Sequence, residues 1–261
     1  MSIRDRFLAA TAVAAILGWA AGSTQAAPVT FFGEDLNPSG STPIPTPLSN
    51  TARDNFFNNL TGVSTETFEE FNSGDSNLSV TFPGSGITAS LSGGVIQNFS
   101  SAGRFAISSP NYYNTDTSTF AINFTAPVAA FGFYGTDIGD FGGVLSLTLT
   151  DIHGNVSSLV VPASEGSGGS QPQNGSALYF GFFDLSDQYT SIAFNNSNTD
   201  DQFGFDNFSV GSLQQVTPTG TPEPSTWVMM MLGFAGLGAA GYYRAKTNHA
   251  PVASQVLKST A

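Results

Sequence analysis

Carboxylates are the only abundant side chains in this 261-residue sequence that could do chemistry. There are 19 Asp and Glu residues, two His residues and no Cys. Without Cys, the chain cannot form disulfides, thiol nucleophiles or Cys-ligated zinc sites. His153 and His249 provide little material for a His-based metal centre or a catalytic triad, and the sequence has no Gly-x-Ser-x-Gly nucleophile elbow. The composition therefore favours a protein that is not an enzyme.

The carboxylates fall into short clusters along the chain. The clusters are Glu66, Glu69 and Glu70; Asp137 and Asp140; Asp184 and Asp187; and Asp200, Asp201 and Asp206. Carboxylate oxygens, with amide and carbonyl oxygens, are the ligands that Ca²⁺ prefers, although no cluster matches an EF-hand loop. Two carboxylates facing each other across a cleft would allow glycosidase chemistry instead, and sequence spacing does not show such a pair. The alternative for every cluster is solvated loop charge.

The elements that would position these residues are short strands. Between residues 65 and 211, apolar and polar residues alternate in segments that Gly, Asn, Asp and Pro separate. The predicted strands are 77–82, 86–91, 118–124, 129–133, 145–150, 155–161, 177–183, 190–194 and 203–210. Residues 151–155 predict a hairpin turn, which gives His153 a turn position rather than a catalytic one. The expected fold is all-β, a jelly-roll-like β-sandwich over residues 65–211.

The segments on either side of the sandwich differ from it in composition. Residues 27–64 are rich in Pro, Ser and Thr and are expected to form an extended arm. Within this arm, residues 49–60 predict a short helix, with Ser49 or Asn50 as its N-cap. After the strands, residues 212–221 are expected to form a linker.

Residues 1–26 have the pattern of a secretory signal peptide. A short basic region precedes an apolar stretch, and Thr24 and Ala26 place small residues at the −3 and −1 positions of a cleavage site. We therefore expect export, with signal peptidase cutting after Ala26 or Ala27. The alternative is an uncleaved membrane anchor.

Residues 226–243 predict a transmembrane helix. The segment contains no charged residue, and a helix of this length, rising about 1.5 Å per residue, just spans the hydrocarbon core of a bilayer. Arg244 and Lys246 follow it, and basic residues beyond a spanning helix stay in the cytoplasm. Residues 247–261 would then form a polar cytoplasmic tail.

A short acidic and proline-containing motif stands just before this helix, at Pro222, Glu223 and Pro224. Over residues 222–246, the Pro-Glu-Pro triplet, the Gly-rich hydrophobic helix and the basic residues resemble a PEP-CTERM sorting signal. That tail is also catalogued as an ice-binding-protein C-terminal motif. The resemblance implies export, at least transient anchoring in the inner membrane and processing near the triplet by an exosortase. Such proteins are typical of Gram-negative bacteria that make exopolysaccharide. Because the basic cluster is thin and a tail follows it, a plain single-pass anchor is the alternative.

Two strand segments carry a second resemblance. Residues 67–71 and 205–210 are similar to the strands that bracket exported β-sandwich ectodomains found before such tails and, more loosely, calcium-containing carbohydrate-binding jelly rolls. Because jelly rolls pair their terminal strands, the acidic residues of both segments are expected to meet. The expected ligands of a structural Ca²⁺ are Glu69 or Glu70, together with Asp206 and Asp201.

The charge of the chain is concentrated in its exported part. The whole sequence has a net charge of −12, whereas residues 27–221 hold 17 acidic residues against Arg53 and Arg104, a net charge of −15. An acidic surface disfavours nucleic acids, whose phosphates need basic partners. It favours cations and disfavours polyanions.

These patterns together predict an exported, non-enzymatic protein of the cell surface or extracellular matrix. The secretion machinery would deliver it, an exosortase would sort it, and the C-terminal helix would hold it at the membrane. The alternative is a Ca²⁺-dependent carbohydrate-binding module acting on exopolysaccharide, and a glycosidase is less favoured. A sugar-binding face requires exposed aromatic side chains beside polar groups. The candidates are Tyr112, Tyr113, Tyr134, Tyr179 and Tyr189, and the alternative, which we favour for most of them, is a packing or edge position.

Overall fold

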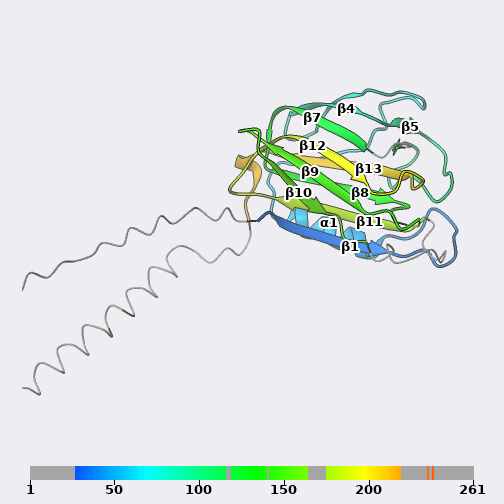
Figure 1. Cartoon of the computed structure of the whole chain (residues 1–261), viewed down its shortest axis with the longest axis horizontal. Coiled ribbons are helices and arrows are strands. Elements are labelled where there is room, and N and C mark those ends of the chain that lie inside the picture. The colour runs from blue at the N-terminus through cyan, green and yellow to red at the C-terminus, as the bar shows by residue number, and fades with distance from the viewer. Residues whose placement is uncertain are drawn as a thin grey trace, which may run out of the picture. The chain divides into compact units, whose positions relative to one another are not determined.

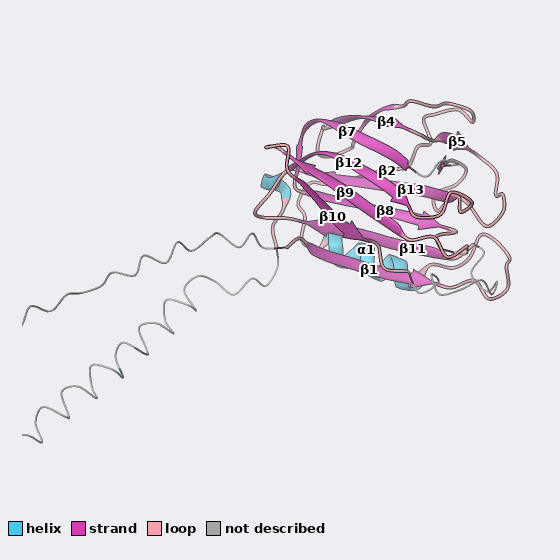
Figure 2. Cartoon of the chain, in the orientation of Figure 1, coloured by secondary structure: helices cyan, strands magenta, loops and turns pink. Residues whose placement is uncertain are grey.

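Two antiparallel sheets packed face to face form the body of the protein. The computed structural model describes residues 27–115, 119–139, 141–163 and 175–218, together with residues 234 and 237. Figures 1 and 2 show the strands of the two sheets and the helix α1 (Pro47–Phe57) beside them. The predicted all-β sandwich is therefore confirmed for these residues.

The central strands of the seven-stranded sheet are buried on both of their faces. Its hydrogen-bonded order is β1 (Val29–Asp35), β11 (Ala177–Phe183), β8 (Ala130–Thr136), β13 (Phe203–Gly211), β6 (Tyr112–Thr115) and β5 (Val95–Gln97), with β2 (Thr65–Glu66) also paired to β13. Every residue of β8 and of β11 is buried. A strand with one solvated face would alternate between buried and exposed residues, so these strands must be covered on both sides.

The six-stranded sheet shows the alternation that the sequence predicts. Its order is β10 (Val156–Val160), β9 (Leu145–Asp151), β12 (Tyr189–Asn196), β7 (Thr119–Val128), β4 (Thr88–Ser92) and β3 (Ser79–Thr81). In β9, the residues Leu145, Leu147 and Leu149 are buried, and the polar residues between them are half-buried. One face of this sheet therefore packs on the core.

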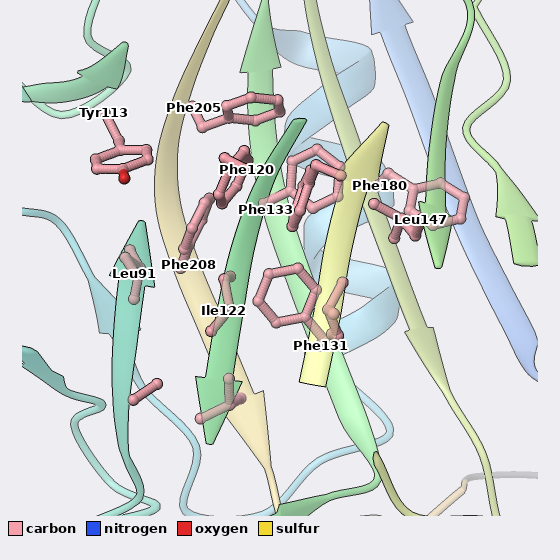
Figure 3. Packing of buried hydrophobic residues seen from close by; sticks show 14 of the residues in the cluster. Leu91, Tyr113, Phe120, Ile122, Phe131, Phe133, Leu147, Phe180, Phe205 and Phe208 are labelled. Atoms are coloured by element: carbon pink, nitrogen blue, oxygen red, sulfur yellow. The ribbon is translucent and has the colours of Figure 1, made fainter. Parts of the chain in front are cut away.

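Phenylalanine rings fill much of the space between the two sheets. Figure 3 shows Phe120 of β7 close to Phe133 of β8 and Phe205 of β13. Across the gap between the sheets, the ring centroids of Phe120 in β7 and Phe205 in β13 are 5.1 Å apart, and Phe133 in β8 meets Phe194 in β12 edge to face, also at 5.1 Å. Each such pair contributes about 0.5–1.5 kcal/mol beyond the burial of its area. Aromatic contacts therefore help to hold the sheets together.

Helix α1 covers one part of the outer face of the seven-stranded sheet. Phe56 is fully buried there and packs against Phe31 of β1 and Tyr179 of β11. Gly132 of β8 and Gly181 of β11 are paired across the two strands. A Cβ atom at either glycine would lie 3.0 Å from the Phe56 ring. The glycine pair thus leaves the room that the ring occupies.

The loop formed by residues 98–111 covers another part of the same face. The backbone N–H of Phe105 donates to Oγ1 of Thr136 in β8 at 3.4 Å, and Phe105 itself is buried. Farther along the loop, the half-buried Ile107 packs against the hydrophobic cluster beneath α1, to which Phe56 and Tyr179 belong. Helix and loop together explain why side chains on the outer face of this sheet are shielded from solvent.

The expected arm of residues 27–64 differs from the structure at its beginning. Residues 29–35 form the strand β1 at the edge of the seven-stranded sheet, paired with β11. The segment does not alternate, because α1 packs against it, and the sequence pattern therefore did not reveal it. The short strands β5 and β6 were also not predicted. The nine strands predicted from alternation each overlap a strand of the structure, but residues 67–71, the expected first strand, do not: β2 ends at Glu66, and a turn follows.

The predicted helix is present, but its N-terminus is capped from another element. It begins at Pro47 after Thr46, and neither Ser49 nor Asn50 is the N-cap. Instead, the carboxylate of Asp35 at the end of β1 accepts the backbone N–H groups of Leu48 and Ser49 at 3.0 and 2.9 Å, and the Ser49 hydroxyl at 2.6 Å. A carboxylate at this place satisfies orphan N–H groups and favours the helix dipole.

The expected linker begins as a packed segment. After β13, Val216 forms an isolated bridge with Leu60 and packs beneath α1. The chain divides into two compact units, one that ends at Val216 and one of residues 217–261. The first unit contains both hydrophobic clusters, the one between the sheets and the one beneath α1.

The segments predicted to direct export and sorting lie outside the described residues. These are the signal peptide 1–26, the sorting signal 222–246 and the tail 247–261; within the predicted helix 226–243, only Phe234 and Leu237 are described, and both are helical. The sorting residues outside the description are Pro222, Glu223, Pro224, Arg244 and Lys246. In the described part of the chain, no helix has the length and the apolar character that crossing a bilayer requires.

Replacing Phe56 tests how far the sandwich depends on α1. We expect Phe56→Ala to lower the free energy of unfolding of residues 27–218 by about 3–5 kcal/mol, because it removes a fully buried ring over the glycine pair. Phe57→Ala is the matched control, since Phe57 is only half-buried, and its effect should be smaller. Urea denaturation measures both, and equal losses would contradict the docking of α1 through Phe56.

Candidate functional site

The last strand, β13, contains a bulge at Asp206 and Asn207. Phe205 and Phe208 both belong to the core between the sheets, although side chains three residues apart in a regular strand point to opposite faces. The pairing of β13 with β8 shifts register at this point, and Asn207 has a φ of 53°. The extra residue directs Asp206 to the outer face, under the loop of residues 98–111.

The carboxylate of Asp206 is fully buried and anchors this loop. Its Oδ2 accepts the backbone N–H groups of Ile107 and Ser108, each at 2.8 Å, and its Oδ1 accepts the N–H of Asn207 at 2.7 Å. The Ser108 hydroxyl lies 3.2 Å from both oxygens. The donor groups therefore point at the positions that a bound cation would need.

Burial makes this carboxylate difficult to ionise. It raises the pKa of Asp206 to about 8, against the opposing effect of the hydrogen bonds from Ser108, Asn207 and Ile107. In the unfolded chain, an Asp has a pKa near 3.9. The folded protein therefore holds a proton on Asp206, over a range of pH in which the unfolded chain does not.

The first acidic segment does meet the last strand, but through Glu66. In the pairing of β2 with β13, Glu66 lies opposite Phe208, so the residues that pair with the last strand come just before the predicted segment 67–71. Glu66 is buried, and its Oε1 accepts the backbone N–H of Phe68 at 2.7 Å. Burial raises the pKa of Glu66. This residue was part of the predicted acidic cluster but not of the expected calcium site.

The predicted ligands Glu69 and Glu70 lie beyond the end of that strand. Phe68 has a φ of 63°, and Glu69 and Glu70 follow it in an exposed turn. Glu69 Oε1 accepts the backbone N–H of Asn111 at 3.1 Å. The left-handed residue therefore turns the chain away before the two glutamates, so they do not continue the strand beside β13.

The fourth predicted ligand, Asp201, belongs to the loop between β12 and β13. It is buried, and its Oδ2 accepts the backbone N–H of Gly139 at 3.2 Å. Within the described ranges, no three acidic or histidine side chains are grouped so that they could hold a metal ion. The structure thus does not gather Glu69, Glu70, Asp201 and Asp206, and the calcium site stays a prediction.

Sequence patterns did not reveal a cleft of about 380 Å³ beside the edge strand β10. Asp151, Asp184, Asp187 and Tyr189 line it, together with residues of β10 and residues 27 and 28. Burial and the negative charges of Asp184 and Asp151 raise the pKa of Asp187. The cleft forms because two loops at one end of the sandwich meet the beginning of β1.

Two of these carboxylates already accept hydrogen bonds from backbone N–H groups of the turns in which they lie. Asp184 Oδ1 accepts the backbone N–H groups of Ser186 and Asp187, at 2.7 and 3.1 Å. Asp151 Oδ1 accepts the backbone N–H of His153 at 2.7 Å, in the turn between β9 and β10. This confirms the predicted hairpin and the turn position of His153.

The five candidate tyrosines do not form an exposed sugar-binding face, because all of them are buried as packing residues. Tyr134 and Tyr179 lie beneath α1, and Tyr113 belongs to the core between the sheets. None of the five is more than 2% exposed: Tyr112, Tyr113, Tyr134, Tyr179 and Tyr189. The sequence carried a signal of this, since aromatic residues occupy consecutive positions in β8 and β11. Consecutive aromatic residues indicate a strand that is covered on both faces.

The titration of Asp206 gives a pH dependence that can be measured. Because its folded pKa of about 8 exceeds the unfolded value, its contribution to stability is full below about pH 4. We expect this contribution to fall as the pH rises to about 8. The total loss is roughly 1.4 kcal/mol for each unit by which the folded pKa exceeds the unfolded pKa. The measurement is the free energy of unfolding of the wild type and of Asp206→Asn between pH 4 and 9.

The difference between the two proteins should shrink and then change sign with rising pH, because the stability that the wild type loses exceeds the low-pH cost of the neutral amide, which does not titrate. The amide places an N–H₂ group against backbone donors, so it should also destabilise the fold by about 1–3 kcal/mol at low pH. Asp200→Asn is the control, since Asp200 is exposed. A pH-independent difference would show that Asp206 remains ionised in the fold.

Calcium dependence can be tested directly. Because N–H groups already surround Asp206, we expect the same melting temperature in EDTA and in millimolar calcium. The measurement is thermal unfolding of residues 27–218 by circular dichroism. A calcium-dependent rise that Glu69→Gln abolishes would establish the calcium site predicted from the sequence.

Comparison with solved structures finds matches at low sequence identity. The K2 cleaved adhesin domain of Lys-gingipain aligns with 12% identity and a TM-score of 0.38, over 57% of this chain and 99% of that chain. The CBM22-1 xylan-binding domain of Paenibacillus barcinonensis Xyn10C aligns with 12% identity and a TM-score of 0.32, over 57% of this chain and 99% of its own. No curated protein sequence matches this chain.

The C-terminal segment gives the specific match. The family model described as the PEP-CTERM protein-sorting motif matches residues 221–245. This range contains the Pro-Glu-Pro triplet, the uncharged segment and Arg244. The chain is therefore a protein with a PEP-CTERM sorting domain.

Proposed function

We propose that this chain is an exported, non-enzymatic protein, whose β-sandwich is displayed and then released through its PEP-CTERM motif. The match at residues 221–245 carries the proposal. The signal peptide directs export, and the helix of residues 226–243 retains the protein in the inner membrane. An exosortase then cuts near the Pro-Glu-Pro triplet and frees the sandwich for the cell surface or the extracellular matrix.

The geometry of the sandwich supports tethering at one end. Val29 pairs with Phe183, Phe183 with Ala130, and Ala130 with Gly211. The first residue of β1 and the last residue of β13 thus stand in one row across four neighbouring strands, which are about 4.8 Å apart. The chain enters and leaves the sandwich at the same end, so a tether following β13 keeps the loops at the other end accessible.

The use of the acidic residues supports a role without catalysis. Asp35, Asp151, Asp184 and Asp206 each accept backbone N–H groups of a helix end, a turn or a loop. Carboxylates held in this way position the backbone. A general acid or base would instead need to reach the proton of a substrate.

Processing at the motif can be followed in a host that has an exosortase. We expect the wild-type chain to appear in the medium in a form shortened near residue 224. The double variant Pro222→Ala, Glu223→Ala should keep its full length and remain with the membrane fraction, because the cleavage signal is lost. Immunoblotting of both fractions, with mass spectrometry of the released C-terminus, measures this.

Pro218→Ala is the matched control, because Pro218 precedes the motif and should leave processing unchanged. A wild-type chain that remains intact in the membrane of the exosortase-bearing host would contradict sorting and leave a plain single-pass anchor. Equal release of the double variant would show that the triplet is not the recognition element.

A further inference from the structure

We propose that a pocket on the outer side of the loop of residues 98–111 binds one uncharged sugar ring of a neutral glycan. The pocket has a volume of about 150 Å³. The side chains used in the argument are Pro43, Asn98, Phe99, Ser100, Ser109 and Pro110. This inference goes beyond sorting and display, and it does not depend on the exosortase.

An exposed aromatic ring forms one wall of the pocket. Phe99 is 58% exposed, although burial of apolar area gains about 25 cal/mol per Å². The flat face of a phenyl ring packs well against the C–H face of a pyranose ring. Pro43 and Pro110 add rigid apolar surface beside it. A ligand that covers Phe99 with C–H groups therefore buries apolar area that the fold itself leaves exposed, and this burial favours binding.

Polar side chains surround this ring and have no partner in the described part of the chain. Asn98, Ser100 and Ser109 are exposed, and no hydrogen bond among the described residues involves their side chains. An amide and two hydroxyls provide donors and acceptors together. Sugar hydroxyls also donate and accept, so this set of groups matches the rim of a pyranose.

The charge around the pocket selects for a neutral ligand. None of the residues that line the pocket is charged, so no cation is available to pair with a uronate or sulfate group. The exported part of the chain has a net charge of −15, which repels polyanions over the range of the Debye length. An acidic glycan is therefore excluded in favour of an uncharged one.

Buried side chains hold the pocket in place from beneath. The Tyr112 hydroxyl donates to Oε1 of Gln97 at 2.7 Å and lies 3.2 Å from the carbonyl oxygen of Phe99. On the other side, Asp206 binds the N–H of Ser108, next to Ser109. A site whose walls are already fixed loses little conformational entropy when a ligand binds.

The size of the pocket limits what it can enclose. Pockets for drug-sized ligands measure about 300–1,000 Å³, so this one accommodates a single small ring. Binding to one ring is weak, and a polymer that offers many rings raises the apparent affinity. A polysaccharide is therefore the appropriate probe.

Affinity electrophoresis of residues 27–218 tests the proposal. This segment contains both hydrophobic clusters, and circular dichroism confirms that each variant is folded. Native gels contain dextran, soluble mannan or alginate, which is acidic. We expect dextran or mannan, and not alginate, to retard the wild type. Phe99→Ala should weaken the interaction by about tenfold, the equivalent of about 1.4 kcal/mol.

Phe141→Ala is the matched control, because Phe141 is 56% exposed and does not line this pocket. It should migrate as the wild type does in every gel, and Asn98→Ala should weaken retardation in the gel that binds the wild type. The proposal is overturned if neither neutral polysaccharide retards the wild type, if alginate retards it most, or if Phe99→Ala and Phe141→Ala behave alike. None of these results bears on cleavage at the sorting motif, so the two proposals fail separately.

Discussion

The burial of both faces of the central strands in the seven-stranded sheet is the constraint on which the rest of the structure depends. On the inner face, rings such as Phe133 and Phe205 meet Phe194 and Phe120 of the six-stranded sheet. On the outer face, α1 and the loop of residues 98–111 must each find an attachment. The glycine pair Gly132 and Gly181 makes room for Phe56 of the helix, and the bulge in β13 places a carboxylate beneath the loop. The covering elements are therefore attached through features of the strands themselves.

The acidic residues are best understood through the backbone groups that they satisfy. Asp35 caps α1, and Asp206 anchors the loop from within the sheet. A buried N–H group without a partner is costly, and a carboxylate can accept several such groups at once. The same side chains look like calcium ligands in the sequence, because the residue types that bind a hard cation are also those that bind N–H groups. Only their surroundings distinguish these two roles.

The sorting motif and the proposed glycan pocket lie in separate parts of the chain. The sorting motif is a linear signal that begins after the sandwich unit ends at Val216. The proposed glycan pocket depends instead on Tyr112 and Asp206, which fix a loop from below. Because the sandwich receives and releases the chain at one end, a tether can be added or removed without altering either cluster of its core.

The sequence alone determined the features that depend on local pattern: the period-two strands, the hairpin around His153, the helix near Phe56 and the sorting motif. Tertiary structure decided which faces are covered. Strand β1 lacks alternation because α1 packs on it. Tyr134 and Tyr179 are buried beneath α1, whereas Tyr113 is buried between the sheets. It also decided that Glu66, rather than Glu69, lies beside β13, since Phe68 turns the chain. Periodicity records the side to which a residue points, and only the folded chain determines what lies there.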